Sequence, residues 1–418
     1  MPASPVQPRP SRWHLVCRVI DNFGDVGVMW RLVRQLHDEH GVQVDFFIDQ
    51  PECLRLMAPG IRVAGEDDAA ESAANAAGMS GSQRGVSPFP SSAADGGIRV
   101  HRLDEAAPVG VNADVIVAGF QARLPEAARR RLLSHAAPTP AAPLLIQLDY
   151  LSAEGWIDDT HGLPSLHPDG LREWFFNPGF GRNNGGLLIE RDLLARRDAF
   201  LASPAGRDEW LRTHGVQTRP GECLISVLAY PTAPLRGLLE GWLRTARHDG
   251  GAEPPCHAAQ EYQALPRHGG KALAPEAPMR PMRPTRPTLH LLIPGAATQP
   301  HLLAEARAVA AQANGRLRVS ALPFLPQPAF DELLWCCDIN LVRGEDSWIR
   351  ALWAEKPWLW HAYPQAEETH LEKLDAFVAR VRVLMSSVPS SGGESPVSPE
   401  TDCPDTPNGP GRNDPAGL

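Results

Sequence analysis

The sequence lacks several features that would each point to a class of protein. No apolar run approaches the roughly 20 residues that a helix needs to cross a bilayer. The proline-rich start, Met1 to Ser11, has no apolar core of a signal peptide, so we expect no secretory leader. Positive charge is not in excess, because the formal net charge is -9, which argues against electrostatic binding of nucleic acid. We therefore expect a cytoplasmic protein without a membrane or a nucleic acid as a direct partner.

Metal-binding patterns are missing as well. The seven cysteines are odd in number and irregularly spaced, and no CxxC or paired His/Cys spacing indicates a zinc site. Several lie in apolar stretches, which is typical of buried free thiols in a reducing compartment. Cys336 and Cys337 are adjacent, but neighbouring side chains of a helix point in different directions, which argues against a metal or redox pair. We expect neither a metal nor a cofactor.

Proline and glycine are abundant, at 42 and 36 residues, and they are concentrated in three stretches of the chain. These stretches, at about 65–97, 248–287 and 386–418, show no sustained periodicity. The second has proline at every third position near its end, which is incompatible with a helix. We interpret the first two as flexible insertions, and the third as a disordered tail that matches a disordered N-terminus at 1–12.

Short apolar runs alternate with helical patterns in the remaining first half of the chain. Residues 13–20 and 42–48 are predicted strands on either side of a helix at 26–37. Later predicted strands at 114–118 and 144–148 flank a helical pattern at 125–133. Such alternation is typical of a parallel sheet covered by helices.

The second half repeats this alternation. The predicted strands are 223–229, 289–293, 318–321, 339–342 and 358–360, and the predicted helices are 234–244, 302–313, 329–336, 347–354 and 368–378. Since 418 residues suit two domains, we predict an α/β protein with two Rossmann-like domains, at 13–200 and 201–380, that face a central cleft. Ligands of such sheets bind beyond the carboxyl ends of the strands, so the segments that follow strands are the candidates for chemistry.

One such segment is Arg343-Gly-Glu-Asp-Ser347, which follows a predicted strand and opens a helix. Gly344 permits a tight turn, and Asp346 is an N-cap candidate with Ser347 in the first turn. The free N–H groups of the first turn and the Arg343 guanidinium suit a phosphate. The plain alternative is that Asp346 only caps the helix and Arg343 pairs with a neighbouring acid, and no Walker-type glycine pattern is present.

Two further segments lie beyond strands of the same half. Phe324 and Gln327, with Phe330 after them, offer aromatic faces and an amide that suit a pyrimidine base, although most phenylalanines simply pack in a core. Tyr363 follows the last predicted strand and is placed to reach a phosphate or a ribose. Together with the Arg343 segment, these clusters predict one nucleotide pocket.

The first predicted strand runs into Asp21-Asn-Phe-Gly-Asp25. This segment is not a GxGxxG motif, so it gives only weak support for a dinucleotide site. Two carboxylates four residues apart at a strand's end can both point into the cleft, one as a general base and the other to orient a substrate. The alternative is that Asp25 caps the next helix and Asp21 accepts hydrogen bonds from the turn.

These segments together resemble the protein-arginine rhamnosyltransferases that modify elongation factor P. The resemblance spans about residues 13–380 and rests on 20–28, 30–32, 147–152, 174–180, 185–187, 322–327, 343–347 and 360–365. It implies a GT-B fold in which the first domain binds the acceptor and the second the nucleotide sugar. It also implies an inverting transfer of rhamnose from dTDP-β-L-rhamnose to an arginine of elongation factor P, a factor that relieves ribosomes stalled at polyproline.

The resemblance also implies residue roles. The catalytic acids fall on Asp21, Asp25 and Glu345, and the donor contacts fall on Asn22, Phe23, Gly24, Tyr230, Phe324, Gln327, Phe330, Arg343, Asp346, Ser347 and Tyr363. The chain departs from the family at Leu228, where an aromatic residue is expected. A guanidinium is a poor nucleophile that must lose a proton as the new bond forms, so we expect Asp21 to be the base, Asp25 to orient the acceptor and Glu345 to support them.

Two other functions stay open at this point. The chain could be a GT-B transferase with another donor or acceptor, which a preference for UDP-glucose would indicate. It could also be a nucleotide-binding module without catalysis, in which Asp21 and Asp25 are only structural. If the chain is a transferase, the Arg343 segment with its helix N-terminus is expected to stabilise the leaving diphosphate without a metal.

Overall fold

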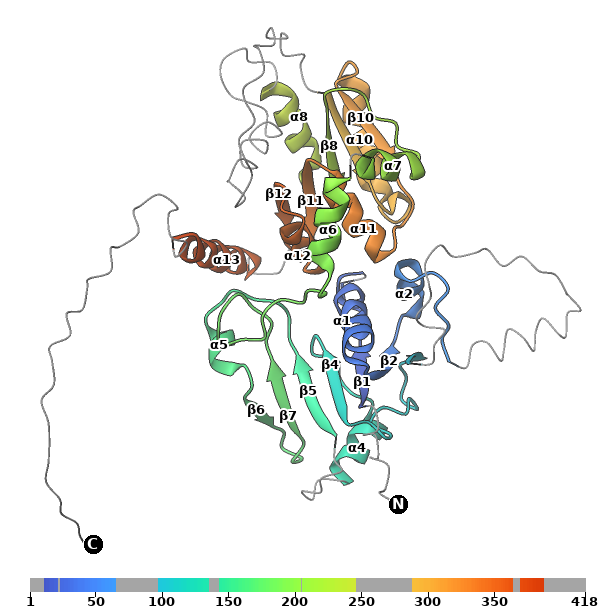
Figure 1. Ribbon diagram of the computed structural model, residues 1–418. Helices are drawn as coiled ribbons and strands as arrows, with labels where there is room; N and C mark the ends of the chain where they lie inside the picture. Colours follow the sequence, from blue (N-terminus) through green and yellow to red (C-terminus); the bar gives the residue numbers. More distant parts are fainter. Residues whose placement is uncertain are drawn as a thin grey trace, which may run out of the picture.

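The structure, a computed structural model, describes residues 11–21, 23–64, 97–134, 143–203, 205–245, 288–363 and 369–386. The predicted insertions and tail lie almost entirely outside the described residues, as do residues 1–10 and the candidate site residue Asn22. The described chain forms two lobes, each built on its own β-sheet (Figure 1). This arrangement confirms the predicted α/β class with two Rossmann-like domains of the GT-B type.

The first lobe is built on a seven-stranded sheet in the order β3-β2-β1-β4-β5-β7-β6. Its strands are β1 (Arg12–Cys17), β2 (Gln43–Ile48), β3 (Ile98–Arg102), β4 (Val115–Gly119), β5 (Leu144–Leu148), β6 (Pro164–Leu166) and β7 (Arg172–Phe176). Its helices are α1 (Gly24–His40), α2 (Pro51–Met57), α4 (Glu126–Ser134) and α5 (Trp156–Thr160). Adjacent strands pair in parallel except β6, which is antiparallel to β7 at the edge, so the sheet is not purely parallel.

Both faces of this sheet are buried, which explains why its central strands are almost continuously apolar. Successive side chains of a strand point to opposite faces. Leu15 and Phe46 accordingly pack in one core with residues of α1, whereas Val16 and Phe47 pack in a second core with residues of α4. β1 begins at Arg12, inside the segment predicted to be disordered, and ends at Cys17, three residues before the predicted end at Ile20.

The second lobe is built on a five-stranded parallel sheet in the order β10-β9-β8-β11-β12. Its strands are β8 (Glu222–Val227), β9 (Thr288–Ile293), β10 (Leu317–Ala321), β11 (Ile339–Arg343) and β12 (Trp358–His361). Its helices are α8 (Leu235–Thr245), α10 (Pro300–Gln312), α11 (Gln327–Cys336) and α12 (Asp346–Trp353), with the 3₁₀ turn η3 (Ala296–Thr298) after β9. All five strands and these four helices lie within a few residues of their predicted positions.

Three more helices complete the described chain: α6 (Leu193–Ala202), α7 (Gly206–Thr213) and α13 (Thr369–Ser386). Phe200 of α6 packs on Trp335 of α11, with ring centres 5.6 Å apart, so α6 packs with the second lobe although it begins before the predicted boundary at 200. α13 returns the chain to the first lobe, where Arg380 forms an ion pair with Asp158 of α5 at 3.2 Å (Figure 1). The chain therefore crosses between the lobes twice.

No helix of the described segments is long and apolar enough to cross a membrane. The same segments contain no group of three or more His, Cys, Asp or Glu side chains that could hold a metal ion. Cys336 and Cys337 are both buried and carry free thiols. Burial raises the pKa of the Cys336 thiol to about 12, so this pair has the character of inert core residues.

Candidate active site

The loop after β1 and the turn after β11 face each other across the cleft between the lobes. Asp21 of the first lobe accepts a hydrogen bond at 2.6 Å from the hydroxyl of Tyr230 in the second lobe. Two glycines leave room for its carboxylate: a Cβ at Gly24 would lie 2.7 Å from Asp21 Oδ2, and one at Gly344 would lie 3.1 Å from it. Gly344 also has a φ of +60°, a conformation that other residues adopt only at a cost. Asp21 therefore occupies a position that both lobes define.

Asp25 is almost fully buried and does not cap a helix through its side chain. Helix α1 begins at Gly24 with Phe23 as its N-cap, and Asp25 lies in the first turn. One carboxylate oxygen accepts the N–H groups of Ile20 and Asp21 at 2.8 and 2.9 Å, and the other accepts the Tyr150 hydroxyl at 3.3 Å. Burial raises the pKa of Asp25, while these hydrogen bonds act against that rise. Its carboxylate thus fixes the loop that carries Asp21.

Glu345 lies at the start of α12 and reaches the first lobe. The helix begins at Asp346 with Glu345 as the N-cap and without a side-chain cap, so the predicted N-cap role of Asp346 is wrong. Glu345 Oε2 accepts the backbone N–H of Leu151 at 2.9 Å. Burial raises the pKa of Glu345 to about 8, so the carboxyl group is mostly protonated at neutral pH. The Asp346 carboxylate instead pairs with Arg31 of α1 at 2.7 Å.

A cavity of about 300 Å³ holds the three predicted catalytic acids, Asp21, Asp25 and Glu345. Lys373 and His370 of α13 lie on its wall. Its remaining surface is strongly aromatic and includes Phe120, Tyr150, Tyr230, Trp348, Trp360 and Tyr363. Carboxylates that can hold a cation, beside rings that can stack on one, are the surroundings that a guanidinium group prefers.

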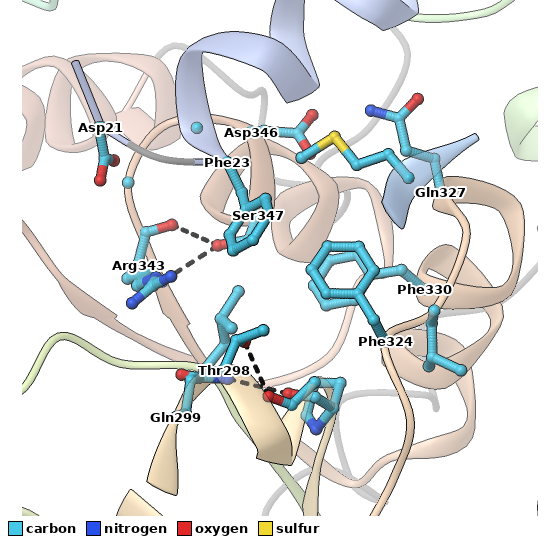
Figure 2. Close-up of a pocket in the computed structure, with 17 residues that line it drawn as sticks. Asp21, Phe23, Thr298, Gln299, Phe324, Gln327, Phe330, Arg343, Asp346 and Ser347 are labelled. Carbon is cyan, nitrogen blue, oxygen red and sulfur yellow. Dashed lines mark hydrogen bonds between the residues drawn. The ribbon is translucent and has the colours of Figure 1, made fainter. Parts of the chain in front are cut away.

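A second cavity of about 90 Å³ adjoins Asp21 and is lined by most of the predicted donor residues (Figure 2), whereas Tyr230 and Tyr363 line the larger cavity. Arg343 and Ser347 lie on one side of it, and Phe324 and Phe330 on the other. The Phe324 ring does not merely pack in its own core, because it contacts Phe23 of the first lobe with ring centres 4.8 Å apart. Asp21, Gly24 and Gly344 line both cavities, so the two spaces meet at Asp21.

Arg343 is the cation of this smaller cavity. Its Nη1 donates to the Ala229 carbonyl at 3.2 Å, and its guanidinium lies 4.9 Å from the centre of the Tyr230 ring. No carboxylate of the described residues forms an ion pair with it, although the charge of Asp21 in the same cavity acts on it. Burial lowers the pKa of Arg343, which reflects the cost of holding this charge away from water. An anion in the cavity would relieve that cost.

The other predicted donor residues make local contacts in this structure. Ser347 donates its hydroxyl to the Arg343 carbonyl and accepts the Arg343 N–H at 3.0 Å, so it fixes the turn. Gln327 Nε2 donates to the carbonyl of Gly27 in α1 at 2.8 Å. Tyr363 is 54% exposed and packs edge-on against Tyr230, with ring centres 5.1 Å apart. The geometry brings all the described candidates to one cleft, although several are engaged with protein partners.

A family model described as elongation factor P (EF-P) rhamnosyltransferase EarP matches residues 13–250 and 276–391. The chain belongs to this family. Membership confirms the resemblance read from the cleft segments, and with it the expectation of a glycosyltransferase.

Two relatives named protein-arginine rhamnosyltransferase show the extent of the similarity. The protein of Pseudomonas aeruginosa is 38% identical over 88% of this chain and 80% of its own length. The protein of Pseudomonas putida is 39% identical over 90% of this chain and 82% of its own. A solved structure described as the structural basis for EarP-mediated arginine glycosylation of translation elongation factor EF-P shares 26% identity, with a TM-score of 0.42, over 89% of this chain and 78% of that one.

Sequence reasoning missed several residues of this EarP-family cleft. Gln299 is 2% exposed and lines the smaller cavity, where its Nε2 donates to the Pro294 carbonyl at 2.8 Å while its Oε1 has no partner among the described residues. The indole of Trp360 donates to the Gly344 carbonyl at 3.0 Å and stacks on Trp348, with ring centres 3.8 Å apart. Gln299 lies just past the end of β9, and because ligands of such sheets bind beyond the carboxyl ends of the strands, the sequence could have identified it.

A buried ion-pair network behind the cleft was also missed. Arg31 of α1 pairs with Asp331 at 3.1 Å and with Glu190 at 3.3 Å, in addition to Asp346. Arg350 of α12 pairs with the same two acids, Asp331 and Glu190, at 2.7 and 2.6 Å. The network joins α1 of the first lobe to α11 and α12 of the second. The motif Trp30-Arg31-Leu32 was a signal for it, but its partners lie far away in sequence.

Proposed function

We propose that this protein transfers rhamnose from dTDP-β-L-rhamnose to an arginine side chain of elongation factor P, with inversion at the anomeric carbon. The observation that carries the proposal is that Asp21 lines both cavities. The smaller cavity contains Arg343, which has no ion-pair partner among the described residues, and the larger one contains the other two acids and the aromatic rings. A transferase needs such a point, where the bond to the donor breaks and the bond to the acceptor forms. Family membership supplies the type of reaction.

In the proposed donor site, Arg343 and the N-terminus of α12 hold the diphosphate, and Phe324, Gln327 and Phe330 hold the thymine. A forked guanidinium and free helix N–H groups both favour phosphate oxygens. The dTDP leaving group gains negative charge as the sugar bond breaks, and these groups stabilise it. We propose that they do so without a metal ion.

In the proposed acceptor site, the arginine of elongation factor P enters the larger cavity. One guanidinium nitrogen attacks the anomeric carbon from the face opposite dTDP, the carbon–oxygen bond breaks, and dTDP leaves with the electron pair. Asp21 takes the proton that the attacking nitrogen loses. Asp25 orients the guanidinium, and Glu345 supports the arrangement from the other lobe. Because the acceptor is a translation factor, we place the reaction in the cytoplasm.

The test is to incubate the protein with elongation factor P and dTDP-β-L-rhamnose and to measure the intact mass of the factor. We expect a gain of one deoxyhexose on one arginine, with the opposite anomeric configuration by NMR and no loss of rate with a chelator. The Asp21→Asn variant should lose about 10²- to 10⁴-fold in rate, the range for removal of a general base. An unmodified factor with fresh donor would refute the proposal.

Two outcomes would instead favour the alternatives. Faster transfer from UDP-glucose than from dTDP-rhamnose would indicate another GT-B transferase. Full function of Asp21→Asn would indicate a binding module, in which the hydrogen bond from Tyr230 to Asp21 is only structural.

A further inference from the structure

Two consecutive residues after β5 contact two acids that belong to different lobes. The hydroxyl of Tyr150 donates to Asp25 Oδ1 at 3.3 Å, within the first lobe. The backbone N–H of Leu151 donates to Glu345 Oε2 at 2.9 Å, across the cleft. All four residues line the larger cavity. Two adjacent residues of the chain, Tyr150 and Leu151, therefore contact both acids and link their positions.

The Tyr150 ring is held in place by its neighbours. It stacks on Phe120 at the end of β4, with ring centres 4.6 Å apart and planes 21° apart. Phe120 and the next residue, Gln121, both have left-handed backbone conformations, with φ of 56° and 59°. Two successive non-glycine residues with positive φ persist only where the surroundings impose them, and such strain concentrates at functional sites. The turn places the Phe120 ring under Tyr150 and so fixes the direction of its hydroxyl.

Several ionisable groups surround the Asp25 carboxylate. Asp21 lies in the same loop, Cys17 ends β1, Tyr150 follows β5 and Glu345 faces it from α12. Burial and the charge of Asp21 oppose ionisation of Asp25, whereas the Tyr150 hydroxyl favours it by donating a hydrogen bond. Loss of that hydroxyl therefore has a defined electrostatic effect, separate from any loss of packing.

We propose that Tyr150 and Leu151 are positioning residues that set the Asp25 and Glu345 carboxyl groups relative to each other, and that the pair is aligned only when the lobes are together. The proposal rests on the proposed function, because it assigns the two acids to acceptor binding. Neither residue touches a reacting atom: Tyr150 acts through Asp25, and Leu151 acts through Glu345.

The first experiment removes only the hydroxyl, in Tyr150→Phe, which keeps the ring on Phe120. We expect kcat to fall about tenfold, since hydrogen bonds to charged groups are the stronger ones, with little change in the KM for the donor. The acidic limb of the profile of kcat against pH should move to higher pH by roughly half to one unit, because the ionised form of Asp25 loses a hydrogen-bond donor. Phe120→Leu, which keeps the hydroxyl but removes the ring beneath it, should shift the limb in the same direction by less.

A double-mutant cycle separates positioning from a general structural role. In an Asp25→Asn background there is no carboxylate to position, so adding Tyr150→Phe should cause no further loss of kcat. Additive losses, or an acidic limb that stays in place in both Tyr150→Phe and Phe120→Leu, would overturn the Tyr150 half of the proposal.

The second experiment tests the contact across the cleft and needs no substrate. Hydrogen exchange of the Leu151 amide is compared in the wild type and in a matched pair of variants, Glu345→Ala and Glu345→Gln. The glutamine retains an oxygen that accepts the N–H, so exchange should stay slow, whereas the alanine variant should exchange about tenfold faster. Equal exchange in all three proteins would overturn the link. Because this readout is independent of sugar transfer, it remains decisive even if the wild type modifies no acceptor.

Discussion

Replacing Arg31 by methionine removes the cation that joins the two lobes most extensively. Its side chain is only 4% exposed and contacts three acids, Asp331, Glu190 and Asp346, at 2.7 to 3.3 Å. Methionine fills much of the same space but offers no charge or hydrogen-bond donor. The substitution therefore tests the ion pairs rather than the packing.

The expected loss in the free energy of unfolding follows from the ion pairs that remain in the variant. Removing one member of a buried ion pair costs about 3–5 kcal/mol, because the other charge stays buried without compensation. Arg350 still pairs with Asp331 and Glu190, so the loss falls mainly on Asp346, whose side chain is 16% exposed. We therefore expect the lower end of the range, about 3 kcal/mol.

Urea unfolding followed by tryptophan fluorescence at neutral pH measures this loss. Arg34→Met is the matched control, since Arg34 lies on the same helix but is 40% exposed and forms a single i,i+4 pair with Asp38 at 3.4 Å. That control should lose less than about 0.5 kcal/mol. If Arg31→Met were no more destabilised than Arg34→Met, the network would not hold the lobes together and the reasoning would be refuted.

Two further substitutions test the cleft itself. Arg343→Gln should weaken binding of the donor nucleotide, measured by calorimetry, by at least about tenfold, because a hydrogen bond to a charged group contributes about 1.5–3 kcal/mol. An unchanged affinity would contradict an anion site at Arg343. Glu345→Gln should change the pH dependence of stability. In the folded protein the pKa of Glu345 is raised from 4.5 to about 8, so between these values the native state holds a proton that the unfolded chain has released. The stability of the wild type therefore falls as the pH rises through this range. The glutamine variant should lack this fall in denaturation measurements from pH 5 to 8, and an identical slope in both proteins would show that Glu345 is not buried as described.

The strands were predictable because the physics that forms them is local. A parallel strand buried on both faces is a short apolar run, and polar residues right after it mark the edge where ligands bind. Asp21 follows β1, Phe324 follows β10, and Tyr363 follows β12. The cleft places them together, as the rule of carboxyl ends predicts.

Short or weakly patterned elements escaped prediction. Strand β6 (Pro164–Leu166) has three residues and forms only because β7 provides an antiparallel partner, so its own sequence carries little signal. The N-cap of α12 was misassigned because an aspartate is favourable both as a cap and in the first helical turn, near the positive end of the helix dipole. Sequence alone does not distinguish these two positions.

The partners of the charged residues could not be predicted from the sequence for a different reason. Asp346 pairs with Arg31, which lies 315 positions away in the chain, and Glu345 accepts from Leu151, which lies 194 positions away. A pattern within a window of residues shows which groups need a partner, but the fold of both lobes decides which partner they find. The same holds for Tyr150, whose role depends on its stacking with Phe120 and its distance from Asp25.

The contacts of α1 indicate how the cleft would admit the proposed donor. Phe23, Gly27 and Arg31 are four residues apart and so lie along one face of the helix, toward the second lobe. The cavity beside Phe23 measures about 90 Å³, whereas ligand pockets usually span about 300–1,000 Å³, so a nucleotide sugar needs the lobes to separate there.

That separation breaks weak contacts at one end of the helix face and spares strong ones at the other. Phe23 and Phe324 form one tilted ring pair, and Gln327 donates one hydrogen bond to Gly27, contacts that contribute about 1 kcal/mol each. The hydrogen bond from Tyr230 to Asp21, beside Phe23, breaks as well and contributes about 1.5–3 kcal/mol. Arg31 forms three buried ion pairs at the other end, and leaving one such charge without a partner costs about 3–5 kcal/mol. We therefore expect the lobes to open at Phe23 and to pivot near Arg31, which keeps Asp346 in register while the donor enters.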